Sequence, residues 1–279
     1  MVKSSYVSRE RCSSRDRGRR APFVDSAGMK LPTRKRIIRR VALSVPRRAG
    51  GEISGLWLTP AARGYLAGDY EPAVVAALRR LVAPGSVCAD VGAHLGYMSL
   101  VLAGLTGPSG RVVAFEASPS NARVLARNMR LNRLGRRVRV VRKAVADGAS
   151  ATVDIFPRGR ASSEWSVYAD FAQRENPVSG VLRGVSVPAT SLDAEFINDR
   201  LDLVKIDVEA AEGLVVAGME RVLRRDRPVI VLEFHRPIGW DAIERLQAEG
   251  YQFETLEAAT LPPLVTPDDV PYQLIARPS

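Results

Sequence analysis

Residues 87–96 read Val87-Cys-Ala-Asp-Val-Gly-Ala-His-Leu-Gly96, and they decide the fold of this chain. The apolar run at their start predicts a buried strand, and the apolar residues 97–106 that follow predict a helix. The glycines between them therefore lie at the carboxyl end of a strand, where open α/β sheets bind ligands. Gly92 and Gly96 allow a tight turn and a close approach to the backbone, and the free N–H groups of the helix favour an anionic group.

The next apolar run, residues 111–116, ends in Glu116, 24 residues after Gly92 (116 − 92 = 24). An acid at this point of a βαβ unit accepts hydrogen bonds from ribose hydroxyls. A dinucleotide site reads G-x-G-x-x-G, whereas this turn reads G-x-x-x-G and has His94 where the second glycine would stand. The spacing therefore favours an adenosine ligand without a pyrophosphate over NAD.

Short β-rich runs and helical stretches alternate along the rest of the chain, which predicts a doubly wound, mostly parallel sheet. Ser118 is the expected N-cap of the helix 119–132, with Pro119 at its first position. Residues 147–200 are too polar and too long for a plain connection, and we expect a loop that contacts the substrate, with Trp165 either stacking on it or filling the core. The remaining expected strands are 138–142, 203–207, 229–234, 251–255 and 272–276, and the remaining helices are 71–82, 211–225 and 240–249.

The charge of the chain is concentrated at its start. The whole sequence of 279 residues has a net charge of +11, but residues 1–50 alone hold 15 Lys or Arg against three acids, so the rest is near −1. This predicts a basic, disordered arm at 1–50 and one catalytic domain at 51–279. We expect no transmembrane segment, because no apolar run is long enough. Two cysteines give no disulfide framework or cysteine metal site, which suits a cytoplasmic protein.

Several motifs together resemble the FkbM family of methyltransferases over residues 68–235. They are Gly68-Asp-Tyr-Glu-Pro72, Asp90-Val-Gly-Ala-His-Leu-Gly-Tyr97, Val113-Ala-Phe-Glu-Ala-Ser-Pro119, Asn128 with Leu131-Asn132, Leu203-Val-Lys-Ile-Asp-Val-Glu-Ala-Ala-Glu-Gly213 and Leu232-Glu-Phe-His235. The chain departs from the family pattern at two positions. His94 replaces the more common Asn, and Ala210 replaces Gly.

The resemblance implies the Rossmann-like, seven-stranded sheet of class I methyltransferases, with S-adenosyl-L-methionine as methyl donor. It implies O-methylation of a hydroxyl on a sugar, glycolipid or secondary metabolite. The methionine part is expected at the turn after the first strand, the ribose at Glu116, and the adenine edge after the third strand, while Glu71 reaches the cofactor or only favours the helix dipole. The residues so assigned to the cofactor are Glu71, Asp90, Gly92, Ala93, His94, Gly96, Glu116, Ala144, Asp147 and Asp207.

Methyl transfer to a weakly acidic hydroxyl needs positioning and a general base. Asp207 is one candidate, because a carboxylate that ends an apolar strand is costly to bury without a partner. His235 is another, because an unperturbed imidazole titrates near neutrality. Glu209 is a third. Both Glu209 and Glu212 serve in the site or only favour the helix dipole, and the alternative for His235 is a structural role. The sequence predicts no metal site.

Two other functions compete with a small-molecule or glycan methyltransferase. An RNA methyltransferase would use the basic arm to hold phosphates, but the chain has Asp207-Val-Glu-Ala210 where a base-methylating enzyme has an Asn-Pro-Pro-Tyr-like segment. A non-catalytic cofactor-binding module is the third possibility, and the acids retained in the cleft argue against it.

Overall fold

The computed structural model describes residues 45–157, 164–175 and 183–279. The predicted arm lies outside the described residues except for 45–50, so its disorder stays a prediction. Residues 45–279 form one compact unit. Residues 45–50 belong to this unit, because strand β1 (Arg47–Arg48) pairs antiparallel with β2 (Trp57–Leu58).

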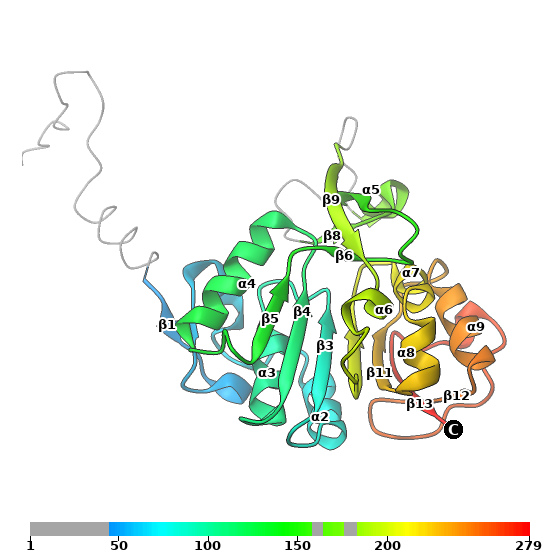
Figure 1. Ribbon diagram of the computed structural model, residues 1–279, viewed down its shortest axis with the longest axis horizontal. Coiled ribbons are helices and arrows are strands. Elements are labelled where there is room, and N and C mark those ends of the chain that lie inside the picture. Colours follow the sequence, from blue (N-terminus) through cyan, green and yellow to red (C-terminus); the bar gives the residue numbers. More distant parts are fainter. Residues whose placement is uncertain (1–44, 158–163, 176–182) are drawn as a thin grey trace, which may run out of the picture. The chain divides into compact units, whose positions relative to one another are not determined.

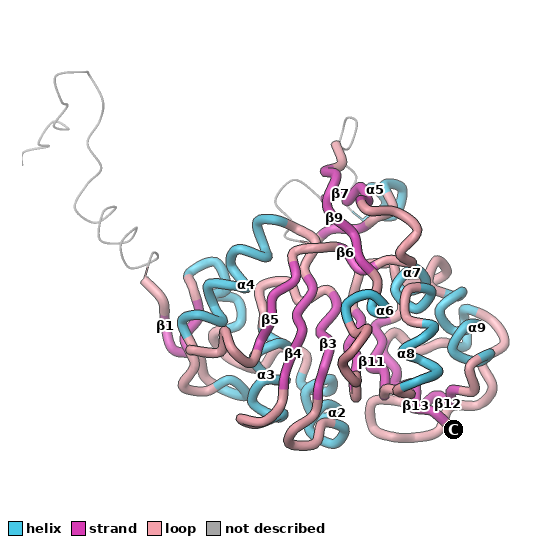
Figure 2. Tube along the Cα trace, viewed as in Figure 1, coloured by secondary structure: helices cyan, strands magenta, loops and turns pink. Residues whose placement is uncertain are grey.

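The main sheet has seven strands in the order β12-β13-β11-β10-β3-β4-β5 (Figures 1 and 2). Neighbours are parallel from β11 to β5, while β13 is antiparallel to both β11 and β12. This confirms the predicted doubly wound, seven-stranded sheet. The strands are β3 (Val87–Val91), β4 (Arg111–Phe115), β5 (Val138–Val141), β10 (Leu203–Ile206), β11 (Val229–Glu233), β12 (Tyr251–Glu254) and β13 (Gln273–Pro278).

Each face of the sheet is covered by helices, because successive strand side chains point to opposite faces. Cys88 packs in one core with α2 (Pro72–Leu81), α3 (Tyr97–Thr106) and α4 (Pro119–Leu131). Its neighbour Ala89 packs in the other core. That second core is completed by α6 (Leu192–Glu195), α7 (Glu212–Ala217), α8 (Glu220–Arg225) and α9 (Trp240–Ala248).

Two helix predictions need correction. The helix expected at 211–225 is divided into α7 and α8 at Gly218, where a Cβ would lie 2.0 Å from the carbonyl oxygen of Ala146. Ser118 does occupy the N-cap position of α4, but its side chain makes no capping bond and lies 2.9 Å from the hydroxyl of Ser120.

The expectation of one long loop at 147–200 is wrong for the described part. A second sheet forms there, in the order β6-β9-β7-β8, because Ile155 and Val187 bury their side chains against Ala144. Helix α5 follows β8. Residues 158–163 and 176–182 lie outside the described residues. The elements are β6 (Ala144–Val145), β7 (Thr152–Pro157), β8 (Trp165–Ser166), α5 (Ala169–Glu175) and β9 (Val185–Thr190).

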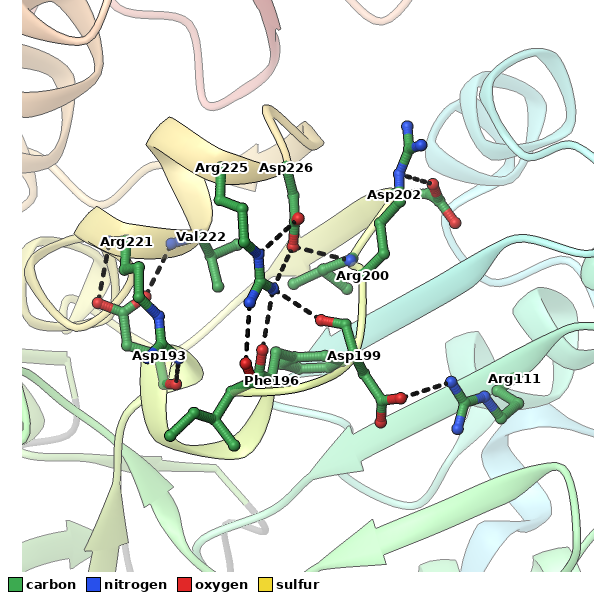
Figure 3. Close-up of polar contacts among 12 residues, drawn as sticks. Arg111, Asp193, Phe196, Asp199, Arg200, Asp202, Arg221, Val222, Arg225 and Asp226 are labelled. Carbon is green, nitrogen blue, oxygen red and sulfur yellow. Dashed lines mark hydrogen bonds and ion pairs between the residues drawn. The ribbon is translucent and has the colours of Figure 1, made fainter.

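Polar contacts hold the connection between α6 and β10 at the amino ends of the strands (Figure 3). The guanidinium of Arg225 donates to the carbonyl oxygens of Phe196 and Asp199 at 2.9 and 2.7 Å. Asp199 in turn pairs with Arg111 of β4 at 3.0 Å. These contacts lie at the end of the sheet away from the carboxyl ends, so they position strands rather than a ligand. The described residues also form three short 3-10 helices: η1 (Gly51–Ile53), η2 (Pro60–Tyr65) and η3 (Pro267–Asp269).

Candidate active site

A cavity of about 550 Å³ lies at the carboxyl ends of β3, β4, β10 and β11. Its walls include the ends of these strands, the segment before α2, the first residues of α3 and α4, the start of β13, and the second sheet, which contributes Ile155 and Trp165. The substrate-contacting role expected for residues 147–200 remains a prediction, but this segment does form one wall of the cavity.

The turn after β3 passes very close to β10. Gly92 has φ +82°, and a Cβ on it would lie 1.7 Å from the carbonyl oxygen of Asp207. Gly96 has φ +96° and packs against Leu125 of α4, so it shapes the turn without lining the cavity. Positive φ favours glycine at both positions, and at Gly92 the close approach of the Asp207 backbone also leaves no room for a Cβ.

Glu116 is held at the end of β4 by backbone groups. Its carboxylate accepts hydrogen bonds from the N–H groups of His94 and Ser118, each at 2.8 Å. The side chain is 7% exposed, and burial raises its pKa to about 7 although these hydrogen bonds lower it. A carboxylate fixed in this way in the cavity wall can accept hydrogen bonds from ligand hydroxyls.

His94 is paired with Tyr65, whose hydroxyl lies 2.6 Å from Nδ1. Burial raises the pKa of the Tyr65 phenol and lowers that of the imidazole, so the phenol donates to a neutral ring. The proton of that ring then resides on Nε2. Among the described residues Nε2 has no hydrogen-bond partner, and His94 lines the cavity.

Lys205 is a buried cation between carboxylates. Its Nζ lies 2.8 Å from Oδ2 of Asp207, and its Cα is paired across the sheet with that of Asp90. Burial lowers the pKa of Lys205, but Asp207, Asp90 and Glu71 outweigh burial and raise it above its usual value. Asp90 is fully buried, which raises its pKa, and Oδ1 has no partner among the described residues.

The cavity has an acidic end near Lys205. Carboxylate oxygens of Glu71, Asp207 and Glu233 all lie within 4.8 Å of one another. Glu233 accepts hydrogen bonds from the Tyr272 hydroxyl and, at 3.1 Å, from the side-chain amide of Gln273. Burial raises the pKa of both Glu71 and Glu233. Three carboxylates at this separation could also ligate a cation, but the ammonium of Lys205 already supplies a positive charge to them.

His235 lies behind the cavity and does not line it. Its Nδ1 is 2.8 Å from Glu212, and its Nε2 is 3.2 Å from Glu209 and 3.6 Å from Glu233. Burial lowers its pKa, but the hydrogen bonds to Glu209 and Glu212 outweigh burial and raise it to about 10. An imidazolium with both nitrogens bound to carboxylates cannot accept a proton at neutral pH.

The structure brings most of the residues predicted from the sequence to one cavity. Gly96, Asp147 and His235 do not line it. Asp147 is exposed and accepts a hydrogen bond from the N–H of Ala149 at 2.9 Å, because β6 has already led the chain into the second sheet. The predicted residues in the cavity wall are Glu71, Asp90, Gly92, Ala93, His94, Glu116, Ala144, Asp207 and Glu209.

Sequence reasoning missed several wall residues. Lys205 could have been found, because a lysine inside the buried strand Leu203–Ile206 needs a partner, and Asp207 two residues on lies on the same face of the strand. Tyr65 and Tyr272 carry no local signal, since they reach the cavity from segments far apart in the sequence. The other polar wall residues outside the predicted set are Tyr70, Tyr97, Asn121, Lys143, Glu164, Glu233 and Gln273.

The charge of the cavity wall fits the expected methyl donor. Seven carboxyl groups and two ammonium groups line it, whereas S-adenosylmethionine carries a sulfonium and an ammonium against one carboxylate. The unpartnered Asp90 Oδ1 is one acceptor for a ligand cation, and Glu116 is an acceptor for ribose hydroxyls. The carboxyl groups in the wall are Glu71, Asp90, Glu116, Glu164, Asp207, Glu209 and Glu233.

Strand order and cavity position are those of the class I methyltransferase fold. Residues 90–253 match the family described as the methyltransferase FkbM domain, which is more than half of the chain. The chain therefore belongs to this family, and the resemblance inferred from its motifs is confirmed. It is an S-adenosylmethionine-dependent methyltransferase.

Three solved structures illustrate the similarity. A methyltransferase FkbM from Methylobacillus flagellatus KT is 18% identical, with a TM-score of 0.45, over 69% of this chain and 44% of that one. This chain thus covers less than half the length of that protein. An O-methyltransferase from Bacillus cereus in complex with SAH is 19% identical over 78% and 86% of the two chains, with a TM-score of 0.42. Fibrillarin from Aeropyrum pernix with S-adenosyl-L-methionine is 14% identical over 73% of each chain, with a TM-score of 0.39. None of the curated proteins matches the chain.

Among the described residues, no helix combines the length and apolar character that a membrane span requires.

Proposed function

We propose that this methyltransferase transfers its methyl group to a hydroxyl of a sugar, glycolipid or secondary metabolite. The observation that carries the proposal is the acidic end of the cavity, where oxygens of Glu71, Asp207 and Glu233 lie within 4.8 Å of one another. Ionised carboxylates only accept hydrogen bonds, so such a cluster suits an acceptor that presents several O–H donors. Aromatic side chains in the same wall, Tyr70 and Trp165 among them, suit the apolar face of a sugar ring.

In this proposal the cofactor occupies the part of the cavity at the ends of β3 and β4. Glu116 accepts hydrogen bonds from the ribose hydroxyls, and Asp90 and the turn at Gly92 hold the methionine part. Ala144 and Asn121 lie in the wall beyond Glu116 and border the adenine. S-adenosylmethionine supplies an electrophilic methyl group on its sulfonium when bound.

Asp207 is the proposed general base. Its carboxylate lines the cavity, and Lys205 holds one of its oxygens at 2.8 Å, which leaves the other for the acceptor hydroxyl. Glu71 and Glu233 share the acidic end, where burial raises the pKa of each carboxyl group. Glu209 lines the cavity with them. His235 is proposed to position Glu209 rather than to take the proton.

The proposal is tested by incubating the full chain with S-adenosylmethionine labelled on its methyl group and a panel of sugars, glycolipids and hydroxylated metabolites. Asp207→Asn should lower kcat about 10²–10⁴-fold on an acceptor found this way. Asp147→Asn is the matched control, because Asp147 is exposed and outside the cavity wall. If the labelled methyl group is found only on nitrogen or carbon atoms of the acceptors, the proposal of hydroxyl methylation is overturned. An unchanged kcat in Asp207→Asn would remove Asp207 as the base.

A further inference from the structure

A 30-residue segment next to the cavity contains no acidic residue. Residues 117–146 span α4 and β5 and carry no Asp or Glu, but they hold nine Arg or Lys. The near-neutral charge of residues 51–279 therefore conceals a strongly basic region. Seven of the nine are exposed arginines, here called the basic face: Arg123, Arg127, Arg130, Arg133, Arg136, Arg139 and Arg142.

The basic face follows two neighbouring elements at one edge of the main sheet. Arg123, Arg127 and Arg130 stand at positions i, i+4 and i+7 of α4, so they form one row with about 5.4 Å between turns. Arg139 lies on β5, the last strand of the sheet, and Arg142 follows that strand. Charged residues commonly protect an edge strand from pairing. That explanation covers Arg139 but not the row along α4.

Most of this charge is not neutralised by other residues that the structure describes. Arg139 pairs with Glu195 at 2.8 Å, and Lys143 pairs with the same carboxylate at 3.3 Å. The other six arginines of the basic face make no ion pair with any described residue. Holding so many like charges together in water is unfavourable unless a polyanion binds them.

An aromatic side chain borders the C-terminal end of α4. The backbone of Trp57 is hydrogen-bonded to the Asn132 side chain at 2.7 and 2.8 Å. The residue is 39% exposed, and the guanidinium of Arg48 lies over its ring. A basic track beside an exposed aromatic ring is the combination that binds single-stranded nucleic acid. A membrane-binding helix instead inserts large apolar side chains, and none of the described residues 117–143 exposes one.

We propose that the basic face binds the phosphodiester backbone of single-stranded RNA. Arginine suits this role because its planar fork binds phosphate oxygens in pairs. The choice of RNA over DNA rests on the proposed function, since RNA carries sugar hydroxyls of the kind the cavity is proposed to methylate. The basic face also leads to the cavity, because Lys143, directly after Arg142, lines its wall.

The test measures binding of the full chain to a fluorescein-labelled 20-nucleotide oligouridine by anisotropy, between 50 and 200 mM salt. Contact with about five phosphates gives a slope of log K against log salt near −3.5. The variant Arg127→Gln/Arg130→Gln should reduce that slope by about 1.4 and weaken binding roughly tenfold at 100 mM salt. Arg236→Gln/Arg245→Gln is the matched control, because it removes the same charge from exposed positions outside the basic face.

Binding that is weakened with a smaller salt slope in the first variant, and unchanged in the control, supports the proposal. An equal change in both variants assigns binding to net charge or to the arm, and overturns it. Absence of RNA binding, or binding to vesicles of anionic phospholipid in preference to RNA, also overturns it. Binding of S-adenosylhomocysteine, measured in every variant, shows that each is folded. This readout also separates a failure of the basic face from a failure of the proposed methyl transfer.

Discussion

The ammonium of Lys205 lies 2.8 Å from the carboxylate of Asp207, two residues further along the chain. Because side chains alternate along a strand, both point to the face that also carries Asp90 on the neighbouring strand. Lys205 is 4% exposed, so little water solvates its ammonium group. The ammonium and the neighbouring carboxylates therefore stabilise one another's charged forms. Removing one partner of such a buried group costs far more than the pair contributes.

Lys205→Met should destabilise the protein by about 3–5 kcal/mol at pH 8, because the Met side chain has similar length but no charge. Without the cation, the folded-state pKa of the neighbouring acids rises. Acids whose pKa is higher in the folded than in the unfolded protein contribute stability below their unfolded-state pKa. This contribution is lost as pH rises through the folded-state pKa. Urea unfolding at pH 5.5 and pH 8 should therefore show the smaller deficit at pH 5.5. Lys143→Met is the control and should cost under ~1 kcal/mol. An equal deficit at both pH values would contradict this role of Lys205.

Gly92→Ala should abolish binding of S-adenosylhomocysteine and destabilise the protein by about 2–4 kcal/mol. The reason is the positive φ of Gly92 and the 1.7 Å approach of a Cβ to the Asp207 carbonyl oxygen. Gly104→Ala is the control, because a Cβ there meets nothing within 4 Å and alanine favours the helix by about 0.5–1 kcal/mol. Calorimetry and urea unfolding measure both effects. Normal ligand binding by the Gly92 variant would argue against a close approach at this turn.

Binding of S-adenosylhomocysteine should strengthen as pH rises from 6 to 8. Glu116 has a pKa of about 7, and only its ionised form accepts hydrogen bonds from both ribose hydroxyls. If binding requires that form, Kd should fall about tenfold over this range. Calorimetry at several pH values measures the change. Glu116→Gln should bind S-adenosylhomocysteine more weakly and lose the pH dependence. If Kd of this variant still changes with pH, another group is responsible for the titration.

The sequence predicts the part of the site that local spacing controls. The turn after β3 places Asp90 and Gly92, and the distance to Glu116 places the acid at the end of the second strand. Asp147 is predicted at the cofactor site but lies outside the cavity wall. The reason is that β6 pairs with β9, a contact between residues more than 40 positions apart (Ala144 with Ala189). No local pattern indicates such a pairing.

The role of His235 could not be predicted for a similar reason. Its surroundings depend on the turn after β10, where Glu209 and Ala210 have φ of +53° and +78°. That backbone conformation is uncommon for residues other than glycine, and it brings Glu209 and Glu212 to the two ring nitrogens. The sequence shows a histidine at a strand end, but only the tertiary contacts show that both of its nitrogens are already bound.

His235→Gln should lower kcat by less than tenfold at pH 7.5, because an imidazolium with a pKa of about 10 is not the base. The variant should instead change stability. A histidine pKa raised from 6.5 contributes stability that is complete below pH 6.5 and is lost as pH rises through 10. The wild-type protein should therefore lose a few kcal/mol between pH 6.5 and 10 that the variant does not lose. A kcat reduced 100-fold or more, with a titration near neutrality removed from the pH profile, would restore His235 as the base.

Tyr65→Phe should change the tautomer of His94. In the wild-type protein the Tyr65 hydroxyl, 2.6 Å from Nδ1, keeps the ring proton on Nε2, which is buried and has no hydrogen-bond partner among the described residues. Removing that hydroxyl lets the proton populate both nitrogens, so a ligand oxygen meets a donor only part of the time. Nitrogen chemical shifts of labelled histidine should report this redistribution directly, and Kd for S-adenosylhomocysteine should rise a few-fold. His94→Asn keeps an N–H donor and should bind more tightly than His94→Ala. Unchanged nitrogen shifts in Tyr65→Phe would mean that some other group sets the tautomer, and equal Kd values for the Asn and Ala variants would mean that the ring donates nothing to the ligand.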